Sequence, residues 1–320
     1  MNNMTTHVIN DKQVFETLMG QKNPFFTEYY AFYSSWFGGI IKNPHMMLLP
    51  MDDHLVHRGD GVFEAMKAVG RSVYLFDEHL QRLFISAEKI GLKSSVDLAE
   101  LKTIVLDTLR AANQNEAVIR IFLSRGPGDF SVNPYDSVAS QLYIVVSKLK
   151  APALEKYTNG VVIGKSRIPN KVSWMAQIKS CNYLPNVLMK KEAVDRGLDF
   201  VIATDTEGHL TESATENIMI VDQSGMVVHP PLDCILKGTT MMRVCELAEK
   251  NGIATQVRTM SIEDLQSARE VMITGTSLNV LPVVKFEDHN IGHGKPGPVA
   301  KKLNELILDD ILVTNEFSVF

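Results

Sequence analysis

The chain has 320 residues and a mass of 35.7 kDa, with 45% hydrophobic and 22% charged residues. These values are typical of a soluble globular protein of about two domains, and they exclude a collagen, a coiled coil and a disordered chain. The net charge of −5, without a polybasic stripe, argues against nucleic acid as a partner. Three cysteines without a CxxC pattern favour a reducing compartment.

The N-terminal residues carry no apolar segment of the kind found in signal peptides. No part of the sequence approaches the roughly 18 uninterrupted apolar residues that a membrane-spanning helix needs. We therefore expect a cytoplasmic protein that binds no membrane.

Eight aromatic side chains crowd residues 25–37, where the sequence is only weakly periodic. We expect this stretch to form an N-terminal arm that packs on the body of the protein or on a second subunit. An aromatic cage around a ligand is the alternative interpretation.

Residues 62–148 alternate between strand-like and helix-like patterns. The pattern predicts two short strands around Gly70, a helix from a cap at Asp77 to Ile90, and a second helix from Ser95. Further strands are predicted at 117–124 and 141–148. Short strands of antiparallel character, with helices grouped between them, indicate an α+β fold.

A linker is expected at residues 149–154, which include a proline, so the chain divides into a small domain (1–148) and a larger one (155–320). In the larger domain the patterns predict strands at 161–165, 199–205, 216–222, 226–230, 271–275 and 280–286, and helices at 185–196, 238–252 and 297–308.

His54 and His57 have a spacing that could serve a metal ion, but HLVH lacks the glutamate of a metalloprotease helix. We expect no metal site here. Two other turns could bind phosphate: Gly238-Thr239-Thr240 opens a predicted helix, and Gly275-Thr276 follows a predicted strand. Neither matches a P-loop, and ordinary capping turns remain an alternative for both.

Lys179 has no acidic residue near it in the sequence, since none lies between Asn170 and Lys191. A desolvated lysine has a lowered pKa and can form a Schiff base, although most lysines are simply solvated. Glu212 lies in a predicted loop, HLTESATEN, where its carboxylate could pair with a cationic ring nitrogen. On local grounds Glu216 is an equal candidate.

Six segments in order resemble the class IV aminotransferases, the fold-type IV enzymes that use pyridoxal 5′-phosphate. They are HRGDGVFEAM, DEHLQRLFISAEKIGL, IKSCNYLPNVLMKKEA, LTESATENIMIV, LKGTTMMRV and ITGTSLNVLPV. The resemblance covers about residues 45–310 and implies a two-domain α+β fold with a small N-terminal domain and a larger, strand-rich C-terminal one. The stretches NPHMMLLPMDDHLVHRGDGVFEA and SRGPGDF are most similar to the branch that contains plant D-amino acid aminotransferase and lyase homologues.

The resemblance implies roles for individual residues. Lys179 corresponds to the lysine that attaches the cofactor, and Glu212 to the glutamate on its pyridine nitrogen. Arg82, in HLQRL, corresponds to the arginine on the cofactor phosphate. The other cofactor contacts that the resemblance implies are Thr239, Thr240 and Thr276 at the phosphate and Tyr183 near the phenolic oxygen, although Tyr183 is one residue closer to the lysine than in branched-chain enzymes.

The sequence departs from the bacterial D-amino acid enzymes at the substrate end. Phe63 replaces their tyrosine, and Phe130 stands near the place of the arginine in their carboxylate-binding pair. Arg125 matches a different arginine, in the SRG turn, so Phe63 and Arg125 are the candidate substrate contacts. Met241 replaces an arginine common after the helix-start threonine.

The resemblance implies an aminotransferase that moves an amino group between an amino acid and a 2-oxo acid, in a homodimer. Branched-chain L-amino acids and D-amino acids both remain possible donors. The alternative is a lyase of the aminodeoxychorismate type, which releases pyruvate and 4-aminobenzoate. A non-catalytic cofactor carrier is disfavoured because both Lys179 and Glu212 are present.

Overall fold

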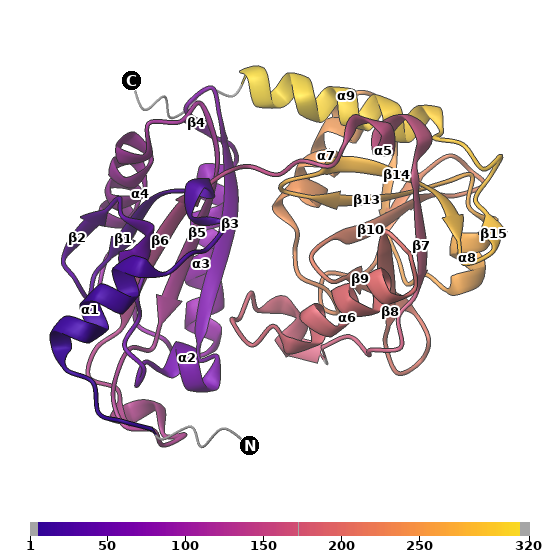
Figure 1. The fold of residues 1–320 in the computed structure, drawn as a ribbon. Helices are drawn as coiled ribbons and strands as arrows, with labels where there is room; N and C mark the ends of the chain where they lie inside the picture. The colour runs from indigo at the N-terminus through magenta and orange to yellow at the C-terminus, as the bar shows by residue number, and fades with distance from the viewer. Residues whose placement is uncertain (1–5, 172, 314–320) are drawn as a thin grey trace, which may run out of the picture.

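The computed structural model of the chain describes residues 6–171 and 173–313, which form two sheets, each with its own helices (Figure 1). The first sheet has six strands in the order β2-β1-β6-β5-β3-β4, and every neighbouring pair is antiparallel. Its strands are β1 (Tyr29–Ser34), β2 (Gly39–Ile41), β3 (Gly61–Val69), β4 (Ser72–Val73), β5 (Glu116–Ser124) and β6 (Gln141–Ser147).

Helices α3 (Phe76–Lys89) and α4 (Leu98–Ala112) pack against this sheet and share its apolar core. Both begin elsewhere than the sequence predicts. Helix α3 starts one residue before Asp77, after Leu75 in a left-handed conformation and without a side-chain cap. Helix α4 starts three residues after Ser95, because Asp97 and Glu100 form a capping box.

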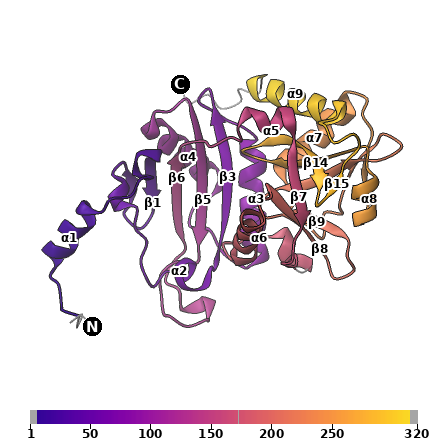
Figure 2. The same cartoon turned by 45° about the vertical axis from the view of Figure 1, so that its right-hand side comes forward.

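The centre of the aromatic stretch is part of the first sheet. Residues 29–34 form β1, which pairs with β6, and the Phe32 ring is buried against Tyr143. Before it, α1 (Asp11–Gly20) is a helix that the sequence analysis missed, although Asn10 and Gln13 form its capping box. This helix buries none of its residues and projects away from the body (Figure 2).

The second sheet has nine strands, and six of them form a closed ring. The order β10-β13-β14-β7-β8-β9 closes because Asn217 of β10 pairs with Glu212 of β9. The strands are β7 (Val161–Lys165), β8 (Phe200–Thr204), β9 (Leu210–Ser213), β10 (Asn217–Val221), β11 (Val227–His229), β12 (Thr255–Val257), β13 (Glu270–Gly275), β14 (Asn279–Phe286) and β15 (His289–Asn290).

The remaining helices lie around the ring or in the connections. They are α2 (His54–Arg58), α5 (Leu154–Asn159), α6 (Leu184–Asp195), α7 (Thr239–Lys250), α8 (Ile262–Ser267) and α9 (Pro298–Val313), with 3-10 turns η1 (Phe26–Glu28), η2 (Pro44–Met46), η3 (Pro134–Asp136) and η4 (Ser173–Gln177). Helices α7 and α9 pack on the ring through a second apolar core. In the described part of the chain no helix combines the length and apolar character needed to cross a membrane.

Candidate active site

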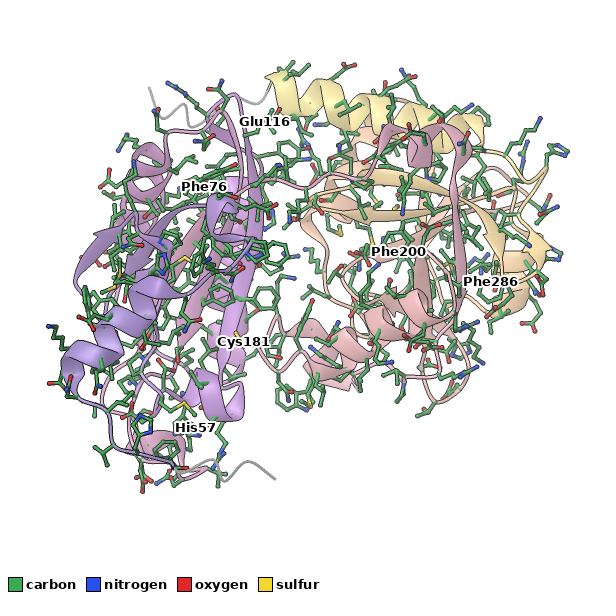
Figure 3. All side chains as sticks on the ribbon, viewed as in Figure 1. His57, Phe76, Glu116, Cys181, Phe200 and Phe286 are labelled. Atoms are coloured by element: carbon green, nitrogen blue, oxygen red, sulfur yellow. The ribbon has the colours of Figure 1, made fainter. Side chains whose placement is uncertain are left out.

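Lys179 lies on a short extended segment between the two sheets. The segment pairs with the first residues of β3, whose edge is free there because β4 pairs only with the last two residues of that strand. The Phe63 N–H donates to the Lys179 carbonyl at 2.9 Å, and the Cys181 N–H donates to the Gly61 carbonyl at 2.8 Å. Cys181 marks this boundary beside β3 in Figure 3. Strand β3 thereby fixes the backbone of the lysine.

The Lys179 ammonium group is buried against two aromatic rings. Its Nζ lies 4.6 Å from the centre of the Phe63 ring and 5.9 Å from that of Tyr183, and the two rings meet edge to face. No hydrogen-bond acceptor contacts Nζ among residues 6–171 and 173–313. Burial, with a contribution from the positive charge of Arg82, lowers the pKa of Lys179 to about 8. Near neutral pH a usable fraction of this amine is therefore uncharged and nucleophilic.

Glu212 lies on β9 and not in the loop that the sequence predicts. The pairing of Glu212 with Asn217, which closes the ring of strands, gives the segment its extended conformation. The Glu212 carboxylate accepts one hydrogen bond, from the Leu236 N–H at 3.1 Å. Burial raises the pKa of Glu212 to about 7, against the opposing effects of this bond and of Lys179. Glu216, the equal candidate from sequence, instead accepts from the adjacent Thr215 N–H.

One small cavity is lined by the residues expected at a cofactor ring. Lys179, Tyr183 and Glu212 all line it. Lys171, which the sequence analysis did not single out, lines it too, with its Nζ 4.7 Å from the centre of the Tyr183 ring. Glu216 lines the cavity as well, so two amines and two carboxyl groups border the same space.

Arg82 lies outside this cavity, in an adjoining cleft that Thr239 also lines. Its guanidinium group is held from one side by Glu64, whose side chain is fully buried. Arg82 Nε donates to Glu64 Oε1 at 2.7 Å, and Nη2 donates to Oε2 at 2.9 Å. Burial alone would raise the pKa of Glu64, but Arg82 and His79 hold it well below its usual range. Arg82 is thus fixed before any ligand arrives.

The N-terminus of α7 faces the same cleft. Arg82 Nη1 donates to the Lys237 carbonyl at 2.9 Å, and the next residue, Gly238, is the N-cap of the helix. A side chain at Gly238 would displace the Asn217 side chain, because its Cβ would lie 1.8 Å from the Asn217 Oδ1 atom. The unpaired N–H groups of the first helical turn can bind an anion.

The three expected phosphate-binding threonines are not equally well placed. Thr239 and Thr240 are buried in the first turn of α7, and the Thr239 Oγ1 atom lies 3.2 Å from His79 Nε2. Thr276 lies in the turn between β13 and β14 and is half-buried. This turn approaches the cavity, since a Cβ built on Gly275 would contact the Glu216 side chain at 3.7 Å.

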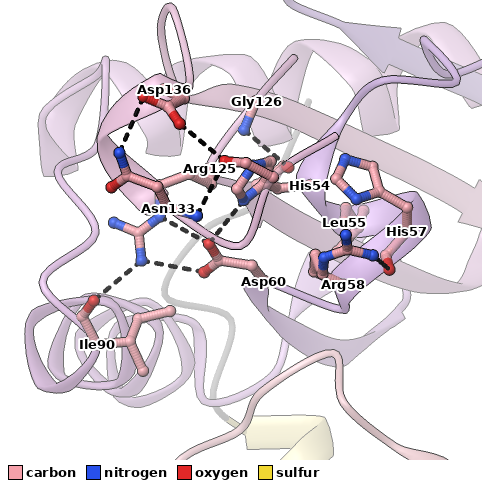
Figure 4. Close-up of polar contacts among 12 residues, drawn as sticks. His54, Leu55, His57, Arg58, Asp60, Ile90, Arg125, Gly126, Asn133 and Asp136 are labelled. Carbon is pink, nitrogen blue, oxygen red and sulfur yellow. Dashed lines mark hydrogen bonds and ion pairs between the residues drawn. The ribbon is translucent and has the colours of Figure 1, made fainter. Parts of the chain in front are cut away.

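Arg125 does not line the cavity. Its Nε and Nη2 donate to both oxygens of Asp60 at 3.0 Å, and its remaining bonds go to the carbonyls of Ile90 and Gly91 (Figure 4). His54 adds a further bond to Asp60 at 3.2 Å. With four of its five N–H donors engaged, this arginine ties the end of β5 to the end of α3. The other candidate substrate contact, Phe63, does face Lys179.

Glu64 and His79 are functional candidates that sequence reasoning missed. Both lie inside motifs already singled out, GDGVFEAM and HLQRL. A signal was present for Glu64, because a carboxylate in an otherwise apolar strand is rarely buried without a charged partner. The sequence alone does not reveal that the partners are on α3.

The chain is similar to known proteins over most of its length. The family model described as "Amino-transferase class IV" matches residues 61–286. The chain is 36% identical to the chloroplastic D-amino-acid transaminase of Arabidopsis thaliana, over 89% of this chain and 77% of that protein.

Solved structures give the same picture. The branched-chain amino acid aminotransferase of Escherichia coli superposes with a TM-score of 0.83 at 26% identity, over 88% of this chain and 94% of that one. A hypothetical aminotransferase from Mycobacterium tuberculosis, solved in its PLP-bound form, superposes with a TM-score of 0.76 at 25% identity, over 89% and 99% of the two chains.

Proposed function

The chain belongs to the class IV aminotransferases, and on this premise we propose that it carries pyridoxal 5′-phosphate between Lys179 and Glu212. It is a transaminase, and it moves an amino group between an amino acid and a 2-oxo acid. The relatives reported above are transaminases, and nothing in them supports the lyase alternative.

The residues that line the cavity fit such a cofactor. Lys179 offers a buried amine without an acceptor, and Glu212 offers a carboxyl group with only one backbone donor. The Ser213 hydroxyl lines the same cavity, is buried and has no hydrogen-bond partner in the described residues. Buried polar groups without partners are uncommon in proteins, and a polar ring would satisfy these.

In this proposal Lys179 binds the cofactor covalently and also takes up the proton of the substrate Cα. When bound, pyridoxal 5′-phosphate supplies a carbonyl carbon that condenses with amines and a ring that withdraws electrons. The lowered pKa of Lys179 favours the uncharged amine that attack on the carbonyl requires. With a substrate bound beside it, the same Nζ would be the group that removes the proton from the substrate Cα.

Glu212 holds positive charge on the ring. An ionised carboxylate beside the pyridine nitrogen favours its protonated form, and a protonated ring stabilises negative charge at Cα. In the free protein burial opposes ionisation of Glu212. A cationic ring would remove that penalty, so this carboxyl group is matched to a positive ligand.

The phosphate group of the cofactor would bind at the N-terminus of α7. Arg82 supplies a guanidinium already oriented by Glu64, and the helix supplies backbone N–H groups. Thr239, Thr240 and the more distant Thr276 are the hydroxyl donors. Charge and hydrogen-bond donors together suit a dianion.

The observation that carries the proposal is the buried, acceptor-free amine of Lys179 in one cavity with Glu212. Borohydride reduction of the holoenzyme, followed by peptide mapping, should place the phosphopyridoxyl group on Lys179. Lys171 is the internal control, because it lines the same cavity. A label on Lys171 or on Lys190 would contradict the proposal.

We propose a D-amino acid as the preferred donor. The support is the 36% identity over 290 residues to the plant D-amino-acid transaminase, against 32% over 257 residues to a putative branched-chain-amino-acid aminotransferase of Methanocaldococcus jannaschii. The test is a panel of both enantiomers of each donor with 2-oxoglutarate and pyruvate as acceptors, and with an assay for 4-aminobenzoate. Turnover of branched-chain L-amino acids alone would contradict it.

The proposed assembly is a homodimer. Exposed apolar side chains gather where the loop after β5 meets the segment around α2; they are Met51, Val56, Phe130, Val132, Tyr135 and Val138. The two segments are joined by a bridge between Asp53 and Pro127. Such a patch is typical of a surface covered by another protein. Sedimentation of the holoenzyme as a monomer near 36 kDa would exclude the dimer.

A further inference from the structure

A buried hydrogen-bonded chain connects β3 to the N-terminus of α7, and the mechanism above does not use it. Glu64 Oε2 lies 2.7 Å from His79 Nδ1, and His79 Nε2 lies 3.2 Å from Thr239 Oγ1. His79 is only 1% exposed. The chain therefore joins a carboxylate of the first sheet to a hydroxyl at the proposed phosphate site, through one imidazole ring.

The carboxylate fixes which ring nitrogen carries hydrogen. Glu64 is ionised, because Arg82 and His79 hold its pKa low, and a carboxylate can only accept. His79 Nδ1 must therefore be the donor. In a neutral ring Nε2 then has only a lone pair, so the Thr239 hydroxyl has to donate to it.

This arrangement is unfavourable once a phosphate is present. A Thr239 hydroxyl that donates to His79 turns its own lone pairs toward the phosphate oxygens, which are also acceptors. Protonation of His79 reverses the bond. The ring then donates from Nε2 to Thr239 Oγ1, and the threonine hydrogen becomes available to the phosphate.

The charges around the ring set when protonation occurs. Burial lowers the pKa of His79, the charges of Arg82 and Lys179 lower it further, and Glu64 opposes them. These are the ionisable groups that face the ring from β3, from its own helix and from the lysine segment, while α7 contributes only the neutral Thr239. A dianion at α7 adds negative charge and raises the affinity of His79 for a proton.

We propose that His79 is a positioning residue that takes up one proton from solvent when the cofactor phosphate binds, and that it turns the Thr239 hydroxyl toward that phosphate. The proposal rests on the function proposed above. The proton from solvent forms an N–H bond at His79 Nε2, no other covalent bond forms or breaks, and the Thr239 hydrogen bond reverses direction. Cofactor binding is thereby linked to pH through a residue that touches neither the ring nor the substrate.

The direct test observes the ring itself. The apoenzyme, labelled with ¹⁵N-histidine, is titrated with pyridoxamine 5′-phosphate, which has the phosphate but cannot condense with Lys179. The His79 ring signals, assigned by their absence in H79Q, should change from the neutral to the doubly protonated pattern. If pyridoxamine 5′-phosphate binds and His79 stays neutral, or if the ring is already charged in the apoenzyme, the proposal is wrong.

A second test counts protons. Calorimetry in two buffers of different ionisation enthalpy gives the proton uptake on binding, and the wild type should take up about one proton more than H79Q. The difference removes the contributions of Glu212, Lys179 and the ligand, which both proteins share. The exposed His289 supplies the matched control, because H289Q should behave as the wild type. Equal uptake by H79Q and the wild type would overturn the proposal.

A double-mutant cycle tests the path through Thr239. Loss of one charge-assisted hydrogen bond should weaken pyridoxamine 5′-phosphate binding about 10- to 100-fold in T239V, whereas T239S should bind as the wild type. If His79 acts through this hydroxyl, H79L and T239V together weaken binding no more than T239V alone. If the factors by which the two substitutions weaken binding multiply in the double variant, His79 and Thr239 act independently and the proposal is wrong.

The two proposals fail in different ways. If the protein does not bind pyridoxamine 5′-phosphate and Lys179 is not labelled, the proposed function fails. If binding and labelling are normal but the protonation state of the His79 ring does not change, only the proposal for His79 fails.

Discussion

The two ends of the candidate site treat their buried charges in opposite ways. At the ring end, Lys179 has no acceptor and Glu212 has one donor, and burial shifts the pKa of each toward the neutral form. At the phosphate end, Glu64 accepts bonds from Arg82 and His79, and Arg82 also reaches the Lys237 carbonyl. The groups at the ring end favour their neutral forms, whereas those at the phosphate end are ionised and hydrogen-bonded. Matched substitutions at the two ends should therefore have opposite effects on the stability of the apoenzyme.

Removal of the Lys179 amine should have the largest effect. K179M should lower transamination by about 10⁴-fold or more, because nucleophile and proton carrier are lost together. The same change should stabilise the apoenzyme by about 1–3 kcal/mol, because a buried amine without an acceptor is replaced by an apolar chain. Single-turnover kinetics and urea unfolding of the apoenzyme measure the two effects. K190M, at the exposed Lys190 on α6, is the control.

Replacement of Glu212 should separate chemistry from binding. E212Q keeps the shape but cannot hold positive charge on the ring, so the half-reaction should slow by about 10²–10³-fold with cofactor still bound. Stopped-flow absorbance with a reactive donor measures the rate. A half-reaction at wild-type speed would identify Glu212 as an ordinary strand carboxylate.

The same substitution at the phosphate end should act on folding. E64Q leaves the charge of Arg82 without its buried partner and should lower the free energy of unfolding by about 3–5 kcal/mol. By contrast, E212Q should leave the stability of the apoenzyme unchanged or raise it. Urea unfolding of the two variants side by side measures the contrast, and equal losses would mean that the two ends do not differ.

The pH dependence of stability should show the smallest effect. The folded state keeps the Glu212 proton up to about pH 7 while the unfolded chain releases it near pH 4.5, so Glu212 lowers stability as pH rises through this interval. The loss is at most about 3.5 kcal/mol, since the two pKa values differ by about 2.5 and each pKa unit corresponds to about 1.4 kcal/mol. Lys179 acts in the opposite sense and at higher pH, because its pKa of about 8 is below the unfolded value of 10.5. The free energy of unfolding of the wild-type and E212Q apoenzymes should be measured from pH 5 to 8. The difference between the two proteins should give the contribution of Glu212 to the pH dependence.

Local patterns predicted most helices and strands but not how they begin. The pattern from Leu80 to Ile90 predicted α3, yet its start at Phe76 depends on Leu75 in a left-handed conformation, which no propensity indicates. Glu212 was assigned to a loop because its neighbours are small and polar. Its strand exists because Asn217 pairs with it to close the ring, a contact set by the whole sheet. The domain boundary at residues 149–154 stays a prediction.

The sequence by itself determined the family and the fold class, and it predicted which residues react, because ordered motifs such as IKSCNYLPN and LTESATEN require no coordinates to compare. Only the tertiary structure decided which charges meet. In the fold Glu64 bonds to Arg82 and His79, and Arg125 bonds to Asp60 away from the cavity. The Lys179 amine has no acceptor among the residues that the structure describes. The physical reason is that the pKa of a charged group depends on its burial and on partners that the fold brings from distant parts of the chain.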